Sequence, residues 1–355
     1  MLLSKCGSAT LLNPHGGRPA PAGLGALKII ATLSAAMRAF ESISFTAPLP
    51  GPRLIVTGAV HGNETCGSFA IRRALHDIEQ GQLGIVSGCV TFVPVTNPLA
   101  HAKRAREGDR NLNRRLAPTD EPREFEDHVA NWLCPLLARH DVLLDLHSFR
   151  TPGEPFAMVG PPDNQGALEP FGHAAREEAL ALRLGVHRVV DGWLDTYATG
   201  VAQRRAQRLR EGRSDHDLHA DYGVGTTEYM RRRGGWAITL ECGQHDDPQA
   251  QEVAYRAIVN TLAHLRLIDA PDPPAATGLE ALRLFQVVDR HHPEDLFSRA
   301  WASFDAVRAG DVIAHRNDGA PLLAPTDGRI VFPSPSAEPG KEWFYLARPH
   351  GRFGA

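Results

Sequence analysis

The chain has 355 residues, of which 43% are hydrophobic and 22% are charged, as in a folded globular protein. Its formal net charge of −3 gives no overall attraction to nucleic acid or to an anionic membrane. No apolar run reaches the roughly 20 residues that a membrane-spanning helix needs. The five cysteines are widely spaced and form no CxxC pair, so they indicate neither a disulfide framework nor a cysteine zinc site, and we expect a cytoplasmic protein.

The N-terminal segment, residues 1–36, is rich in glycine, alanine and proline. It contains one short apolar patch at residues 23–36, which Lys28 interrupts. Because a secretory signal needs an uninterrupted apolar core, we favour a disordered extension over a signal peptide. Met37 is an alternative start of the protein.

The first half of the chain alternates strand-like and helix-like patterns. Residues 53–60 and 89–95 are short apolar runs that predict buried strands. Residues 65–80 between them predict a helix, and residues 99–118 form a basic, irregular stretch that predicts a long loop. The apolar face of the predicted helix comprises Phe69, Ile71, Ala74, Leu75 and Ile78.

The alternation continues beyond this loop. Thr119 or Asp120 is expected to cap a second helix. The apolar stripe of that helix consists of Phe125, Val129, Trp132, Leu133, Leu136 and Leu137. Further predicted elements are a strand at 141–146, a helix at 169–184 that ends at Gly185, a strand at 236–240 and a helix at 249–267.

This order of elements predicts an α/β domain over residues 37–268, with a mostly parallel sheet covered by helices on both faces. The composition then changes at residues 269–278, DAPDPPAATG, which we interpret as a linker. Short β-like runs separated by Asp-Gly turns follow, and residues 279–355 are expected to form a small β-rich C-terminal domain.

Several side chains suited to metal chemistry lie near the ends of predicted strands. His61, His147 and Glu241 each follow an apolar run directly, at the sheet edge where ligands of parallel sheets bind. Glu64 lies three residues after His61, about one helical turn, so both side chains can converge on one ion. His147 is the best third ligand, and Asp145 can orient a ligand from the same side of its strand.

Each of these features has a simpler interpretation. An HxxE sequence on its own is more often a helix start with a solvated histidine, and Glu241 alone would be a salt-bridged glutamate at the sheet edge. Residues 215–221, DHDLHAD, are a rival metal cluster in a polar stretch without adjacent strands. Cys242 has no second motif to activate it, so a packing role is favoured over a nucleophilic one.

Four short motifs occur together in one order: HGNE at 61–64, RNLNR at 110–114, DLHS at 145–148 and TLECG at 239–243. In this order the chain resembles the succinylglutamate desuccinylase/aspartoacylase family, a branch of the zinc carboxypeptidase superfamily. The resemblance covers roughly residues 50–345. It implies a zinc-carboxypeptidase-like mixed, mostly parallel sheet flanked by helices, and a zinc-dependent amide hydrolase that acts on N-acyl amino acids.

The resemblance also implies roles for individual side chains. His61, Glu64 and His147 take the positions of the ligands of one Zn²⁺ per chain. Glu241 takes the position of the catalytic glutamate, and Arg106 falls where the family keeps an arginine beside the reacting carbonyl. The substrate-binding positions are Asn113, Arg114 and one arginine of the run 231–233, for which we take Arg231 while the other two stay open.

Three functions are therefore compared. A deacylase of N-acyl amino acids is favoured, because the resemblance implies that the C-terminal domain narrows the entrance for small substrates. A zinc carboxypeptidase acting on peptides and a non-catalytic binding module on the same scaffold are the alternatives. The expected partner is a small molecule, not nucleic acid or membrane, because the basic loop lacks interleaved aromatic residues. The sequence leaves the oligomeric state open, a homo-oligomer included.

Overall fold

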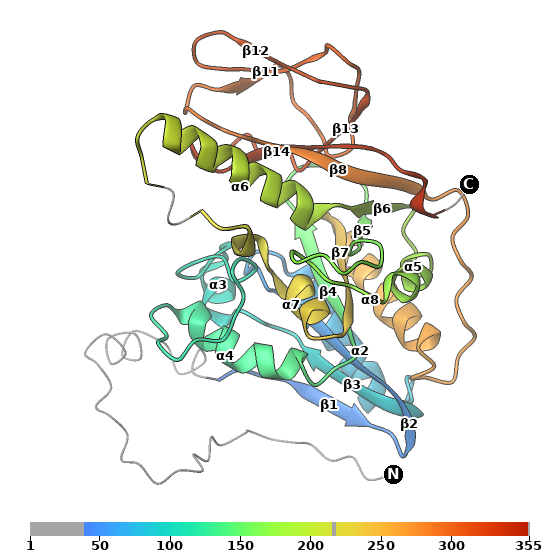
Figure 1. The fold of residues 1–355 in the computed structure, drawn as a ribbon. Helices are drawn as coiled ribbons and strands as arrows, with labels where there is room; N and C mark the ends of the chain where they lie inside the picture. Colours follow the sequence, from blue (N-terminus) through green and yellow to red (C-terminus); the bar gives the residue numbers. More distant parts are fainter. Residues whose placement is uncertain (1–38, 215–217, 354–355) are drawn as a thin grey trace.

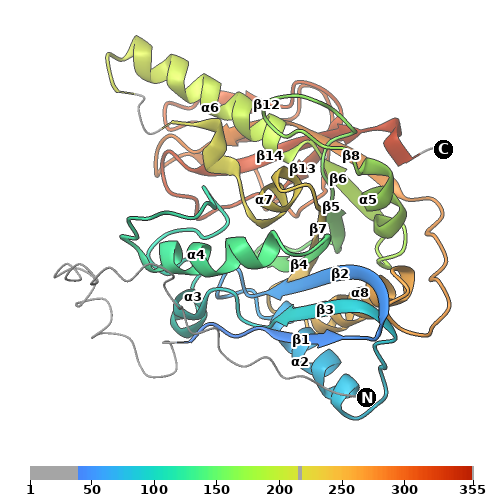
Figure 2. The ribbon, with the colours of Figure 1, turned by 60° about the horizontal axis from the view of Figure 1, so that its bottom comes forward.

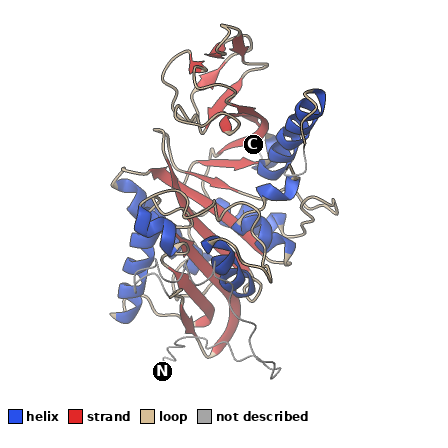
Figure 3. Ribbon diagram, turned by 90° about the vertical axis from the view of Figure 1, so that its left-hand side faces the viewer, coloured by secondary structure: helices blue, strands red, loops and turns tan. Residues whose placement is uncertain are grey.

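The computed structural model describes residues 39–214 and 218–353, so the predicted extension at residues 1–36 lies outside the described residues. Its centre is one 11-stranded sheet with the strand order β1-β3-β2-β4-β7-β5-β6-β8-β14-β13-β10. Helices flank this sheet on both faces (Figure 1, Figure 3). The predicted α/β class, with a mostly parallel sheet and a small C-terminal β-rich region, is confirmed.

The parallel part of the sheet carries the candidate site. Its strands are β2 (Leu49–Gly58), β3 (Ser87–Val93), β4 (Val142–Phe149) and β7 (Trp236–Gln244), and β1 (Ile43–Thr46) lies antiparallel at the edge. β4 and β7 continue past their predicted ends because they stay paired, with His147 opposite Glu241. His147 and Glu241 therefore lie in the last part of their strands instead of following them.

The helices bury apolar stripes against the two faces of the sheet. On one face pack α2 (Cys66–Glu79), α5 (Ala174–Ala181) and α8 (Gln249–His264). On the other face pack α4 (Phe125–Leu137) and α7 (Thr226–Arg232). Figure 2 shows α2 and α4 on opposite sides of β2 and β3. Both faces of the central strands are therefore buried, as their continuous apolar sequences require.

Two sequence predictions about helices α2 and α4 were wrong in detail. The sequence pattern predicts Phe69 on the apolar face of α2, but 54% of this residue is exposed. Phe69 lies two residues from the fully buried Ile71, and residues two apart on a helix do not share a face. Neither Thr119 nor Asp120 caps α4, which begins at Phe125. There the Asp127 carboxylate accepts hydrogen bonds from the backbone N–H groups of residues 123 and 124.

The helix predicted over residues 169–184 is also shorter than expected. It begins at Ala174, where the Asp163 carboxylate accepts a hydrogen bond from the Ala174 N–H. Glu169 lies in the preceding irregular segment, because its carboxylate forms an ion pair with a buried arginine of α7. Gly185 adopts a φ of +84°, so it has the left-handed conformation expected after a helix.

The remaining strands extend the same sheet into the C-terminal part of the chain. β5 (Phe156–Met158) runs antiparallel to β7, β6 (Arg188–Asp191) is parallel to β5, and β8 (Glu280–Asp289) is parallel to β6. β14 (Glu342–Pro349), β13 (Gly328–Val331) and β10 (Ala306–Val307) complete it. A separate small sheet comprises β12 (Pro321–Leu323), β11 (Val312–His315) and β9 (Leu296–Phe297), at the top of Figure 1. Strands from both sides of the predicted linker at residues 269–278 therefore belong to one hydrogen-bonded sheet.

Shorter elements complete the fold around the carboxyl edge of the sheet. Within the predicted loop 99–118 lies a short helix, α3 (Pro98–Lys103), which the Asn97 side chain caps by accepting from the Ala100 N–H. The other elements are α6 (Trp193–Arg210) and the 3₁₀ turns η2 (Ala220–Gly223) and η3 (Gly351–Phe353). None of the described helices is long and apolar enough to span a membrane.

Candidate metal centre

The HGNE motif forms the tight turn between β2 and α2. Ala59 enters the turn with a φ of +47°, and α2 begins at Cys66. A side chain at position 62 is excluded, because a Cβ there would lie 1.9 Å from the carbonyl carbon of Ala100 in α3. The glycine between His61 and Asn63 therefore allows the turn to pack directly on α3.

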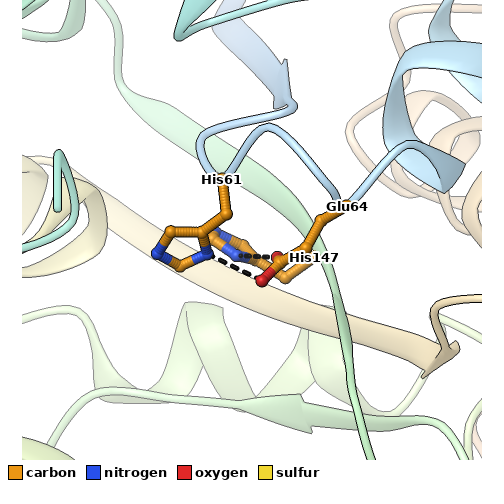
Figure 4. Close-up of side chains that lie close together, drawn as sticks. All are labelled: His61, Glu64 and His147. Atoms are coloured by element: carbon orange, nitrogen blue, oxygen red, sulfur yellow. Dashed lines mark hydrogen bonds and ion pairs between the residues drawn. The ribbon is translucent and has the colours of Figure 1, made fainter. Parts of the chain in front are cut away.

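His61, Glu64 and His147 meet at this turn (Figure 4). The His61 Nδ1 atom lies 2.8 Å from Glu64 Oε1, and the His147 Nδ1 atom lies 2.8 Å from Glu64 Oε2. One ligand atom from each residue lies within 4.8 Å of the other two, and all three side chains are buried. The two residues of one turn and the strand residue predicted as their partner are thus brought together.

The donor set of this cluster suits a zinc ion. Two imidazole nitrogens and one carboxylate are a common ligand set of catalytic zinc, which keeps a fourth position open. In both histidines Nδ1 faces the shared carboxylate while Nε2 is held elsewhere. His61 Nε2 lies 3.1 Å from Asn111 Oδ1, and His147 Nε2 lies 2.9 Å from Asp145 Oδ2. Such outer partners fix the orientation of metal-binding imidazoles.

Buried negative charge makes the centre attractive to a cation. Asp145 is fully buried and accepts hydrogen bonds from Thr57 Oγ1, at 2.6 Å, and from Thr226 Oγ1. Burial lowers the pKa of His147, but the charges of Asp145 and Glu64 outweigh it and raise that pKa well above its usual value. The two carboxylates thus favour a positive charge between them, which a metal ion would supply.

Glu241 lies beside this cluster on the neighbouring strand. Glu241 on β7 pairs with His147 on β4, and both residues line one cavity. Burial, and secondly the negative charge of Glu64, raise the pKa of Glu241 to about 8. Its Oε2 atom is buried and has no hydrogen-bond partner among the described residues. A buried carboxyl group of this kind is suited to accepting and releasing a proton near neutral pH.

Arg106 reaches the centre from the loop that follows α3. Its Nη1 atom donates a hydrogen bond to Glu64 Oε1 at 3.0 Å, and 46% of its side chain is exposed. The guanidinium therefore lies at the border between the buried cluster and the cavity, which it also lines.

Asn113 and Arg114 continue the loop along the cavity wall. Asn113 Oδ1 accepts a hydrogen bond from the Thr226 N–H at 2.9 Å, which ties the loop to the start of α7. The Arg114 guanidinium carbon lies 4.9 Å from the ring centroid of Trp193 and 5.7 Å from that of Tyr197. Arg114 forms no ion pair with any described residue. Burial lowers the pKa of Arg114, but the negative charges of Glu342 and of nearby tyrosines outweigh burial and raise that pKa.

Arg231 has protein partners on all three guanidinium nitrogens. Nε donates to Glu177 at 2.8 Å, Nη1 to Glu169 at 2.9 Å, and Nη2 to the Ala237 carbonyl oxygen at 2.8 Å. The side chain is buried, and the charges of Glu177 and Glu169 overcome the effect of burial and raise its pKa. These contacts join α7 to β7, to α5 and to the segment that precedes α5.

The other two arginines of the run lie at the surface. Arg232 forms an ion pair with Asp221 at 2.7 Å, and Arg233 lies over the ring of Tyr229. Asp221 belongs to the rival cluster DHDLHAD, of which residues 215–217 lie outside the described residues. Among the described residues, the His61, Glu64 and His147 group is the one cluster with metal-binding geometry.

The cluster opens into a cavity of about 1530 Å³ between the carboxyl edge of the sheet and the C-terminal strands. Sequence reasoning missed three residues that hold polar side chains around the cluster by hydrogen bonds: Asn111, Thr226 and His245. His245 Nδ1 lies 2.9 Å from Ser148 Oγ. Asn111 belongs to the RNLNR motif and could have been noticed there, whereas no local signal marks Thr226 or His245.

The fold and the cluster together define an α/β protein with a candidate mononuclear metal centre at the carboxyl edge of a parallel sheet. Residues 50–153 match the model of the succinylglutamate desuccinylase/aspartoacylase catalytic domain. This segment contains His61, Glu64, Arg106 and His147. This segment of the chain is therefore similar to the catalytic domain of that family. No curated protein matches the chain in sequence.

Solved structures of succinylglutamate desuccinylases and of an ectoine utilization protein share the fold over most of the chain. A succinylglutamate desuccinylase/aspartoacylase from Rhodobacter sphaeroides is 21% identical, with a TM-score of 0.64 over 88% of this chain and 90% of that one. A succinylglutamate desuccinylase from Silicibacter sp. TM1040 is 18% identical, with a TM-score of 0.63 over 88% and 89%. The product-bound ectoine utilization protein EutE from Ruegeria pomeroyi is 19% identical, with a TM-score of 0.60 over 86% and 88%.

Proposed function

We propose that the protein is a zinc-dependent amide hydrolase that removes the acyl group from an N-acyl amino acid or a related small amide. One observation carries the proposal: the buried cluster of His61, Glu64 and His147 shares its cavity with Glu241, whose Oε2 has no partner among the described residues. The similarity of residues 50–153 to the desuccinylase/aspartoacylase catalytic domain supports it, because desuccinylases and aspartoacylases are named for cleaving such amides.

Each group at the centre has a task in that reaction. Bound zinc would lower the pKa of water toward about 7 and polarise the substrate carbonyl. Glu241 accepts the proton of the attacking water and then delivers it to the leaving amine. Arg106, beside Glu64, donates hydrogen bonds to the oxygen on which negative charge develops, a contribution of roughly 3 kcal/mol for one such donor.

The substrate carboxylate binds at the loop of the RNLNR motif. Arg114 has no ion-pair partner among the described residues, and its planar guanidinium can bind a carboxylate through two parallel hydrogen bonds. Asn113 supports the position of this loop through the Thr226 N–H. We leave Arg231 out of the substrate contacts, because its three nitrogens are occupied by Glu177, Glu169 and a backbone carbonyl.

The proposal includes a small-molecule partner and a cytoplasmic location. The four described cysteines, Cys66, Cys89, Cys134 and Cys242, are all free, which is compatible with a reducing compartment.

Metal analysis and a substrate panel test the proposal together. The purified chain is expected to hold one zinc ion, to release free amino acid from N-acetyl, N-succinyl or N-formyl amino acids, and to lose this activity when a chelator removes the metal. Cleavage of C-terminal dipeptides in place of these amides would favour a carboxypeptidase. Tight binding of an N-acyl amino acid by the zinc-loaded chain without hydrolysis would favour a binding module.

A further inference from the structure

The cavity beside Glu241 has an apolar wall. Four residues that line it, Phe149, Met158, Trp193 and Phe332, belong to or pack against one hydrophobic cluster between the parallel sheet and the C-terminal strands. Phe149 lies two residues after His147 on β4, and Met158 of β5 pairs with Thr239, two residues before Glu241. The apolar wall therefore begins next to the proposed reacting centre.

Phe332 is held in this wall by an unusual backbone conformation. Its φ is +51°, a left-handed value that side chains with a Cβ adopt rarely. Its N–H donates a hydrogen bond to Ser303 Oγ at 3.1 Å, and its ring centroid lies 6.0 Å from that of Phe149 and 5.5 Å from that of Phe156. Conformations of this kind persist where surrounding contacts enforce them, and they concentrate at binding sites.

The wall of the cavity formed by the loop after α3 is polar and cationic, unlike the apolar wall around Phe332. It carries Arg106, Asn113 and Arg114, of which Arg114 forms no ion pair with the described residues. A cavity with a cationic wall and an apolar wall is complementary to a molecule with a carboxylate at one end and an apolar group at the other. Burying an apolar group against aromatic side chains is favourable in proportion to the area removed from water.

We propose that the substrate carries an apolar group, aliphatic or aromatic, that binds against Phe149, Met158 and Phe332, and that Phe332 sets the size of the group accepted. This inference rests on the proposed amide hydrolysis and concerns its specificity. The apolar group can belong to the acyl part or to the amino acid part, because either would offer the same chemistry to this wall.

Two substrate series show whether the apolar group belongs to the acyl part or to the amino acid part. Both are measured as kcat/KM on the zinc-loaded full chain. One series varies the acyl group on alanine through acetyl, butanoyl, hexanoyl, benzoyl and succinyl. The other keeps acetyl and varies the amino acid through alanine, leucine, phenylalanine and aspartate. We expect kcat/KM to rise at least about tenfold with apolar size in one series, and the acidic member of that series to react more slowly than its apolar members.

The outcomes separate this inference from the proposed function. Hydrolysis that is fastest with the acidic substrate in both series, or that rises with apolar size in neither series, would overturn the specificity and leave the amide hydrolase intact. Absence of hydrolysis across both series would overturn the amide hydrolase and the inference with it.

Variants of Phe332 test the wall itself. Phe332→Ala is expected to lower the ratio of kcat/KM for the best apolar substrate to that for N-acetylalanine about tenfold, and Phe332→Leu to retain most of this ratio for aliphatic groups. The matched control is Phe297→Ala, since Phe297 packs against Trp343 at 4.5 Å between centroids and does not line the cavity. It should leave the ratio unchanged.

Met158→Ala provides an independent test if Phe332→Ala does not fold. Met158 lies on β5, outside the segment that carries Phe332, and lines the same cavity, so its truncation should lower the same ratio. A ratio that stays at the wild-type value in every folded variant of Phe332 and Met158 would refute the assignment.

Discussion

Glu241 combines burial, a raised pKa and an unpartnered oxygen with a position opposite His147 on the next strand. If it transfers the proton, Glu241→Gln should lower kcat about 10²–10⁴-fold, because the amide cannot accept a proton but keeps the shape of the side chain. Steady-state hydrolysis of the best N-acyl amino acid checks this. Zinc content should stay at one ion per chain.

The control for this variant is Glu79→Gln, an exposed glutamate at the end of α2, which should behave as wild type. Turnover that is unchanged in Glu241→Gln would refute the mechanism. A loss of zinc in that variant would instead make Glu241 part of the metal site.

Asp145 is expected to act through His147 and not on the substrate. Asp145→Asn removes the buried charge that holds His147 Nε2 at 2.9 Å, and the loss of such a partner typically weakens metal binding 10–100-fold. Competition with a zinc chelator measures the affinity directly. Asp141→Asn is the matched control, because that carboxylate forms a surface ion pair with Arg53. Equal zinc affinity in the two variants would contradict the assigned role.

At the scale of elements, the ion pairs of Arg231 join α7 to α5 and to the segment that precedes α5. Arg231→Ala leaves Glu177 and Glu169 buried without their partner, so the free energy of unfolding should fall by about 3–5 kcal/mol. Arg232→Ala removes an exposed ion pair and an exposed hydrogen bond to the Leu168 carbonyl oxygen, and should cost at most about 1 kcal/mol. Urea unfolding followed by circular dichroism compares them. A stable Arg231→Ala protein with raised KM would restore the predicted substrate role.

The Asp295 carboxylate, in the turn before β9, is expected to make the stability of the protein depend on pH in the acidic range. Burial raises the pKa of Asp295, but hydrogen bonds from the N–H groups of His291, His292 and Asn317 and from Arg316 outweigh it and lower the pKa to about 2. A carboxyl group with a folded pKa below its unfolded value of about 3.9 stabilises the protein fully above the unfolded value. That stabilisation, about 2 kcal/mol, is lost as the pH falls from about 4 to 2.

Asp295→Asn should therefore be less stable than wild type at neutral pH, and its stability should vary less between pH 4 and 2. Chemical unfolding across this pH range provides the comparison. Parallel pH profiles of the two proteins would show that Asp295 is not the source of the acid sensitivity.

At the scale of the whole molecule, the main sheet continues through the predicted domain boundary. β8 pairs with β6, and the cluster around Phe149 and Phe156 includes residues of β8, β13 and β14. Deleting residues 269–355 would expose the edge of β6 and this cluster, so we expect the shortened chain to be unfolded or aggregated. Circular dichroism and urea unfolding test this expectation. Two separate transitions in the full chain would instead indicate independent domains.

Local patterns in the sequence were sufficient to predict the main strands and helices, and two of the three candidate metal ligands, His61 and Glu64. Continuous apolar runs mark strands that are buried on both faces, and the spacing of His61 and Glu64 follows from one turn of chain. These features depend on neighbours a few residues apart. The lengths of β4 and β7 were underestimated, because the pairing of His147 with Glu241 depends on two segments about 90 residues apart in sequence.

Tertiary structure alone decided the remaining features. Asn111 on His61, Thr226 on Asp145, and Glu177 on Arg231 are contacts between distant segments, and no periodicity encodes them. The position of Phe332 in the cavity wall depends on the C-terminal strands continuing the main sheet. The sequence therefore determined which side chains could bind a metal. Packing determined which of them meet, because burial and charge act between residues that only the fold makes neighbours.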